Sequence, residues 1–95
     1  MSGYRIVRGS AVKDEEAMKE YARLWKPIGE RYGARLLAGR GELQAREGEN
    51  CKRALIIEFP SYEQVITCYE DPDYQTAMEY ALKAYDRELI IVEGC

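Results

Sequence analysis

Residues 53–61 read Arg-Ala-Leu-Ile-Ile-Glu-Phe-Pro-Ser, and this stretch decides the fold. Residues 53–59 form a run of strand formers that is apolar on both faces until Glu58, and Pro60 cannot continue the hydrogen-bond ladder of a central strand. Ser61 stands three residues before Gln64, which is a capping-box pattern. The stretch therefore predicts a buried strand followed directly by a helix.

The chain before this stretch predicts a strand and a long helix. Residues 4–8 alternate loosely between apolar and polar side chains and are rich in strand formers. Residues 14–16 are acidic, as the first turn of a helix favours, and the helix is expected to run to about residues 32–33. Pro27 is expected to kink or divide it, because proline removes a backbone donor. Apolar side chains recur at helical spacing at Ala17, Met18, Tyr21, Leu24, Trp25 and Ile28.

The remaining segments complete a βαββαβ order. Residues 34–46 are expected to form a long second strand with a bulge or bend at Gly39 and Gly41. Asp71 and Pro72 end one helix and begin another, with Asp71 as N-cap. Residues 89–92 predict the last strand. The sequence thus predicts one α+β domain over residues 1–95, with the ferredoxin-like βαββαβ fold and a four-stranded antiparallel sheet.

Composition excludes several classes of function. The chain has no histidine, which removes the commonest general base and metal ligand, so we expect no metal site and no cofactor, although a carboxylate-only magnesium site stays conceivable. The three cysteines form no Cys-x-x-Cys pair, which predicts reduced thiols. A net charge of −3 without a basic, aromatic cluster argues against nucleic acid. No apolar run approaches the roughly 18 to 20 residues of a membrane span, and no secretory signal is visible, so we expect a cytoplasmic protein.

Four segments together resemble a bacterial family of uncharacterised proteins. They are Tyr-Gly-Ala-Arg-Leu-Leu at 32–37, Glu-Phe-Pro-Ser at 58–61, Tyr-Glu-Asp-Pro-Asp-Tyr-Gln at 69–75, and Arg87 ahead of Val-Glu-Gly at 92–94. In this order they resemble the domain of unknown function 1330. That family is similar to the dimeric α/β barrels, in which two ferredoxin-like sheets pair face to face. The resemblance implies the same dimeric α/β barrel here and no known reaction.

The strands also predict a homodimer from their own pattern. Leu55, Ile57 and Phe59 occupy one face of the third strand, and Ala54 and Ile56 occupy the other. Helices on one side of a sheet cover only one face. A second copy of the chain is expected to cover the other, because monomers avoid a large exposed apolar patch.

Glu58 is the candidate catalytic residue, because a carboxylate that interrupts an apolar strand must be paired, solvated by a cavity or shifted in pKa. It is predicted to act as a general acid or base or as a ligand anchor; an ion pair with a strand arginine is the alternative. The candidate ligand-binding residues are Arg35, Tyr69, Tyr74 and Arg87. The alternative for the two arginines is a structural ion pair, and the alternative for the two tyrosines is packing at the edge of the core.

Two classes of function follow from the sequence. The first is a domain that binds an unknown small molecule between sheet and helices and could be a cofactor-independent enzyme. The second is a non-catalytic homodimeric interaction or accessory module. An enzyme should have a closed pocket of roughly 300 Å³ or more with convergent polar groups, whereas an interaction module should have an interior filled by side chains.

Overall fold

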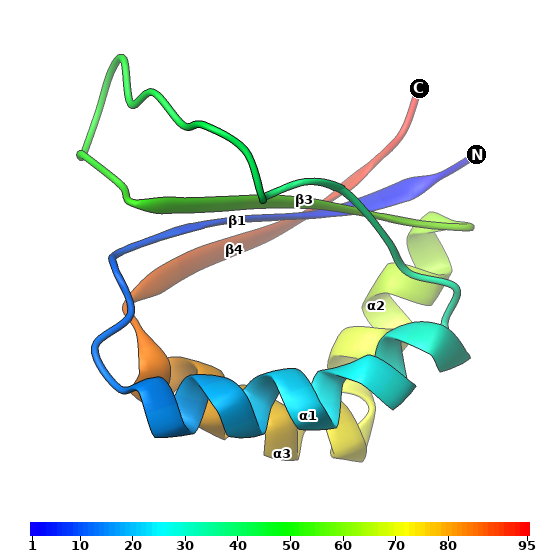
Figure 1. Cartoon of the computed structure of the whole chain (residues 1–95). Coiled ribbons are helices and arrows are strands. Elements are labelled where there is room, and N and C mark those ends of the chain that lie inside the picture. The colour runs from blue at the N-terminus through cyan, green and yellow to red at the C-terminus, as the bar shows by residue number, and fades with distance from the viewer.

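The computed structural model describes the whole chain, residues 1–95, and confirms the predicted fold class. A single antiparallel sheet of four strands lies on a layer of helices, and the strands stand in the order β2-β3-β1-β4 (Figure 1). This is the ferredoxin-like arrangement, with the second helical region in two pieces. The elements along the chain are β1 (Gly3–Gly9), α1 (Glu15–Arg31), β2 (Arg35–Ala38), β3 (Arg53–Phe59), α2 (Tyr62–Glu70), α3 (Pro72–Ala84) and β4 (Arg87–Glu93).

Local signals fix the helix starts where the sequence predicts them. The Ser61 hydroxyl accepts a hydrogen bond from the Gln64 amide at 3.1 Å and caps α2. The Asp71 carboxylate accepts one from the Asp73 amide at 2.8 Å and caps α3, with Pro72 at the first helical position. Pro27 lies inside α1 without dividing it. No helix has the length and apolar character needed to cross a membrane.

The predicted second strand is wrong in length. Residues 34–46 were expected to be extended, but β2 covers Arg35–Ala38 alone, and its pairing with β3 is irregular between Leu36 and Ala38. Gly39 has a φ of 153°, and a Cβ there would lie 2.5 Å from the Leu55 side chain. The backbone leaves the sheet at this glycine, and the polar sequence that follows has few strand formers to continue the pairing. Residues 39–52 form a loop on the side of the sheet opposite the helices (Figure 1).

The two faces of the sheet have different surroundings. Side chains at odd positions of β1, β3 and β4 face the helices, and Phe59 and Val7 among them are buried. The opposite side, here called the outer face, has no helix over it (Figure 1). Large apolar side chains on the outer face remain exposed at Leu37, Ile56, Ile90 and Val92. The sheet therefore has a covered inner face and an uncovered apolar outer face.

Candidate functional site

A cavity of about 710 Å³, partly open to solvent, lies between α1 and the inner face of the sheet, beneath β2 and β3. Tyr21 and Ile28 of α1 pack with Ile57 and Phe59 of β3 in the core beside it. We call this space the inner cavity. The residues of α1 that line it include Met18, Tyr21, Ala22, Trp25, Lys26 and Glu30; those of the sheet include Leu36, Arg53, Leu55 and Ile57.

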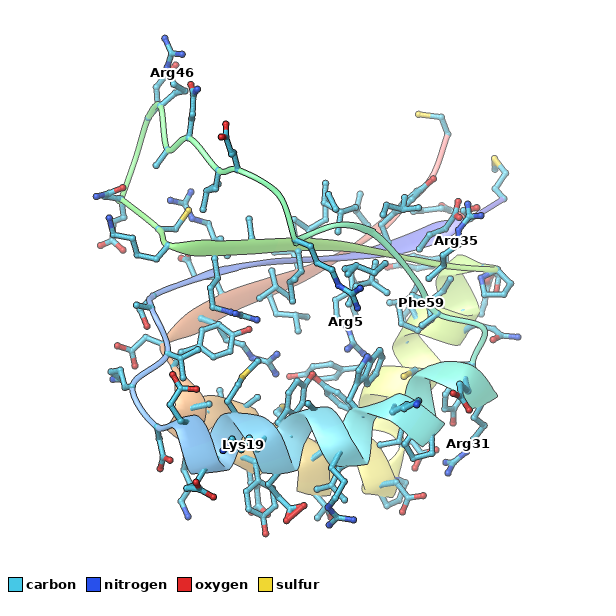
Figure 2. The ribbon with its side chains drawn as sticks, in the orientation of Figure 1. Arg5, Lys19, Arg31, Arg35, Arg46 and Phe59 are labelled. Carbon is cyan, nitrogen blue, oxygen red and sulfur yellow. The ribbon has the colours of Figure 1, made fainter.

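Three arginines project from neighbouring strands toward the helices near this cavity. Arg53 begins β3 and Arg87 begins β4, and both are in register with Gly9 of β1, one on each side. Arg5 lies on the same face of β1, in register with Ile57. Figure 2 shows Arg5 pointing from the sheet into the space above the helices. We call Arg5, Arg53 and Arg87 the inner arginines.

Arg5 is the most enclosed of the inner arginines, with 1% of its surface exposed. Its guanidinium carbon lies 4.5 Å from the centre of the Tyr74 ring and 4.8 Å from that of Trp25. Its only side-chain hydrogen bond is from Nη2 to the Cys68 thiol at 3.7 Å, which is a weak acceptor. Nε and Nη1 have no partner. Aromatic faces partly offset the burial of this charge, but no strong acceptor meets it.

Arg53 forms part of the cavity wall itself. Its guanidinium carbon lies 5.1 Å from the centre of the Tyr85 ring, and its Nε is buried without a hydrogen-bond partner. Gly9 makes room for this stacking, because a Cβ at that position would lie 2.6 Å from the Tyr85 ring. Arg53 therefore contributes a charged guanidinium to the cavity wall, while its Nε is enclosed without a partner.

Arg87 is paired with tyrosine hydroxyls instead. Its Nη2 donates to the Tyr74 hydroxyl at 3.0 Å, and that hydroxyl lies 3.2 Å from the Tyr21 hydroxyl. Burial lowers the pKa of Arg87, but the two tyrosine oxygens raise it more, so the group stays charged. Burial, then the Tyr74 hydroxyl, raises the pKa of Tyr21, which stays neutral. Arg87, Tyr74 and Tyr21 thus form one hydrogen-bonded chain, in which either tyrosine hydroxyl can donate to the other.

The predicted site residues fall into two groups on opposite faces of the sheet. Tyr74 and Arg87 lie on the inner face, and Tyr69 packs against the Tyr74 ring with its hydroxyl 3.3 Å from the Met78 sulfur. Glu58 and Arg35 lie on the outer face, away from the inner cavity. The structure thus does not bring Glu58 together with the predicted tyrosines.

Glu58 has the contacts of an ion pair. Its Oε1 accepts from Arg35 Nη2 at 2.7 Å, and its Oε2 accepts from the Ser2 hydroxyl at 2.9 Å and the Tyr4 hydroxyl at 3.4 Å. The hydrogen bonds from Ser2, then Arg35 and then Tyr4, lower its pKa. A carboxylate held ionised is a weak base, so these contacts match the ion-pair alternative; the catalytic role of Glu58 stays a prediction.

Sequence reasoning predicted a pocket between sheet and helices but missed Arg5 and Arg53, two of the inner arginines. Because side chains alternate along a strand, Arg53 lies on the same face of β3 as Leu55 and Ile57, and Arg5 lies on the same face of β1 as Val7. An arginine on the face of the core residues was the signal in the sequence that could have identified both. Trp25, one of the apolar residues at helical spacing, packs against the core and also lines the cavity, with its ring against Gly29. Cys68 is buried, and burial raises its pKa, as expected of an unreactive thiol.

The family model described as "Domain of unknown function (DUF1330)" matches residues 2–95. The chain belongs to this family. No curated protein matches it.

Solved structures share the fold at low sequence identity. A protein of unknown function from Rhodopseudomonas palustris is 20% identical with a TM-score of 0.72, covering 99% of this chain and 83% of its own. A dimeric protein of unknown function and ferredoxin-like fold from Bacteroides fragilis is 16% identical with a TM-score of 0.59, covering 98% and 96%. A putative antibiotic biosynthesis monooxygenase from Nitrosomonas europaea is 20% identical with a TM-score of 0.61, covering 98% and 89%. Such likeness shows the fold alone.

Proposed function

We propose that this member of the family is a homodimer that binds a small molecule in the inner cavity. The observation that carries the proposal is the cavity itself. Its volume of about 710 Å³ lies within the roughly 300 to 1,000 Å³ typical of small-molecule sites. Its walls combine apolar and aromatic side chains with a few polar groups, as such sites do. An interaction module with a filled interior would lack this space.

The dimer is supported by the outer face. Ile90 and Val92 of β4 are 58% and 41% exposed, and Ile56 of β3 is 38% exposed, although all three lie in a sheet. A partner sheet would bury them together. Two structural relatives are described as dimeric and ferredoxin-like, one from Bacteroides fragilis and one from Thermobifida fusca. The inner cavity lies on the other side of the sheet, so pairing through the outer face leaves it accessible.

Binding is the part of the function that the geometry supports best. The Cys68 thiol is buried beside Arg5, and Glu58 lies outside the cavity. Tyr21 is the titratable hydroxyl on the cavity wall, and its raised pKa makes it a hydrogen-bond donor rather than a base. These residues hold and orient a ligand without an evident nucleophile.

Native mass spectrometry of the protein purified from its own host tests the proposal. A retained small molecule of defined mass is expected, together with a dimer. Ala22→Phe, on the exposed face of α1 that lines the cavity, should displace the ligand. Ala11→Phe, at an exposed position outside the cavity, serves as the matched control. Retention of the same ligand by Ala22→Phe would contradict a site in the inner cavity.

A further inference from the structure

The inner arginines carry positive charge that no carboxylate of the chain neutralises. None of the three forms an ion pair, although seven ion pairs join charged groups elsewhere in the fold. Arg87 has a tyrosine hydroxyl, but buried nitrogens of Arg5 and Arg53 have no partner at all. A buried charge without a partner costs free energy, and it is normally paired or hydrogen-bonded. An anion bound in the adjoining cavity would offset this positive charge.

The charges around the cavity favour the same kind of ligand. Lys26 and Arg40 are exposed lining residues, and Arg53 lines the cavity with its buried Nε. The one carboxylate of the lining is Glu30, which is exposed on α1. Arg5 adds a further charge behind Trp25 and Ile57, both of which line the cavity. The positive groups therefore outnumber the negative ones, and the least solvated of them face inward.

The rest of the lining is apolar and flat. Trp25 contributes an aromatic ring, and Leu36, Leu55 and Ile57 form an aliphatic wall opposite α1. Such walls bind a largely apolar body and disfavour a strongly hydrated dianion. A ligand with a single carboxylate on an aromatic or aliphatic body provides both a negative charge for the arginines and an apolar surface for the walls. The planar carboxylate also matches the donor geometry of a guanidinium.

We propose that the inner cavity binds a monocarboxylate with an apolar body, whose carboxylate accepts a hydrogen bond from Arg53 and whose body lies along Trp25. The proposal deepens the proposed function and rests on it. Arg5 is a positioning charge, since it lies behind the cavity wall and raises the positive potential there.

The test uses a matched pair of probes and the single tryptophan of the chain. Trp25 is the only tryptophan, so its fluorescence reports directly on the cavity. The full chain is titrated with 2-naphthoate and with 2-naphthamide, which has nearly the same shape and no charge; calorimetry checks the affinities, and inorganic phosphate is tested as a competitor. We expect 2-naphthoate to bind about tenfold or more tightly than the amide, and phosphate to leave its affinity unchanged.

Variants assign the preference to Arg53. Arg53→Met should remove the preference for the carboxylate, whereas Arg53→Lys keeps a charge and should keep part of the preference even if packing changes. Arg23→Met is the control, because Arg23 is an exposed arginine of α1 outside the cavity lining, with 70% of its side chain accessible. Circular dichroism and thermal unfolding of each variant show that it folds.

The outcomes separate this proposal from the one on which it rests. Equal affinity for naphthoate and naphthamide, or an unchanged preference in folded Arg53→Met, would overturn the carboxylate while leaving a ligand cavity in place. Competition by phosphate at equal strength would also overturn it in favour of a general anion site. If neither probe binds and no ligand is retained in native mass spectrometry, the ligand-binding function itself fails, and the carboxylate proposal fails with it.

Discussion

Replacement of Ile90 by aspartate should dissociate the dimer. Ile90 lies on β4 of the outer face with 58% of its surface exposed. Complete burial of an isoleucine side chain contributes about 1.5 to 3 kcal/mol, so the surface that Ile90 leaves for a partner corresponds to about 0.9 to 1.7 kcal/mol per chain. A symmetric dimer contains the position twice, which gives about 1.7 to 3.5 kcal/mol, or roughly a 20- to 300-fold weaker dimer. Desolvation of two aspartates adds to this loss.

The measurement is the dimer dissociation constant by sedimentation equilibrium, with light scattering at micromolar concentration as a check. Leu82→Asp is the matched control, because Leu82 is 55% exposed but lies on α3, in the helical layer. The control should stay dimeric. A parent protein that is monomeric at micromolar concentration would refute pairing through the outer face, and so would an Ile90→Asp variant as tightly dimeric as the parent.

Two further predictions concern the Glu58 carboxylate and the three cysteines. Glu58 has a lowered pKa in the fold, so its ion pair with Arg35 stabilises the protein above about pH 4.3, the value in the unfolded chain, and that stability is lost as pH falls through the folded pKa. Denaturant unfolding measured from pH 7 to pH 2 should therefore show a smaller loss of unfolding free energy for Glu58→Gln than for the parent protein. The affinity of the variant for naphthoate should be unchanged; a weaker affinity would support the predicted ligand role of Glu58 instead. Replacement of Cys51, Cys68 and Cys95 together by alanine should leave the dimer and ligand binding intact. Thermal unfolding should show a loss of about 1 to 3 kcal/mol of stability, mainly from buried Cys68. Loss of ligand binding in a folded variant would contradict this prediction.

The sequence alone determined the elements whose signals are local. The start of α2 follows from Ser61 and Gln64, and the start of α3 follows from Asp71 and Pro72, because a cap bonds to amides two or three residues away. The third strand was predicted with the bounds that β3 has, since a short apolar run between a polar loop and a proline admits little else. With these elements in order, the ferredoxin-like fold followed.

Only the tertiary structure decided which residues meet. Alternation places Glu58 with Ile56 and Arg53 with Leu55, but the sequence does not say which set faces the helices, because both sets are largely apolar. The assembled sheet puts Glu58 outside with Arg35 and brings Arg5, Arg53 and Arg87 together inside, from strands separated by dozens of residues. The sequence likewise did not determine where β2 ends. The backbone turns out of the sheet at Gly39, where it lies close to the side chain of Leu55, a residue distant in sequence. The cavity lies between side chains of α1 and of β2 and β3, which come from segments far apart in the sequence, so no segment by itself reveals it.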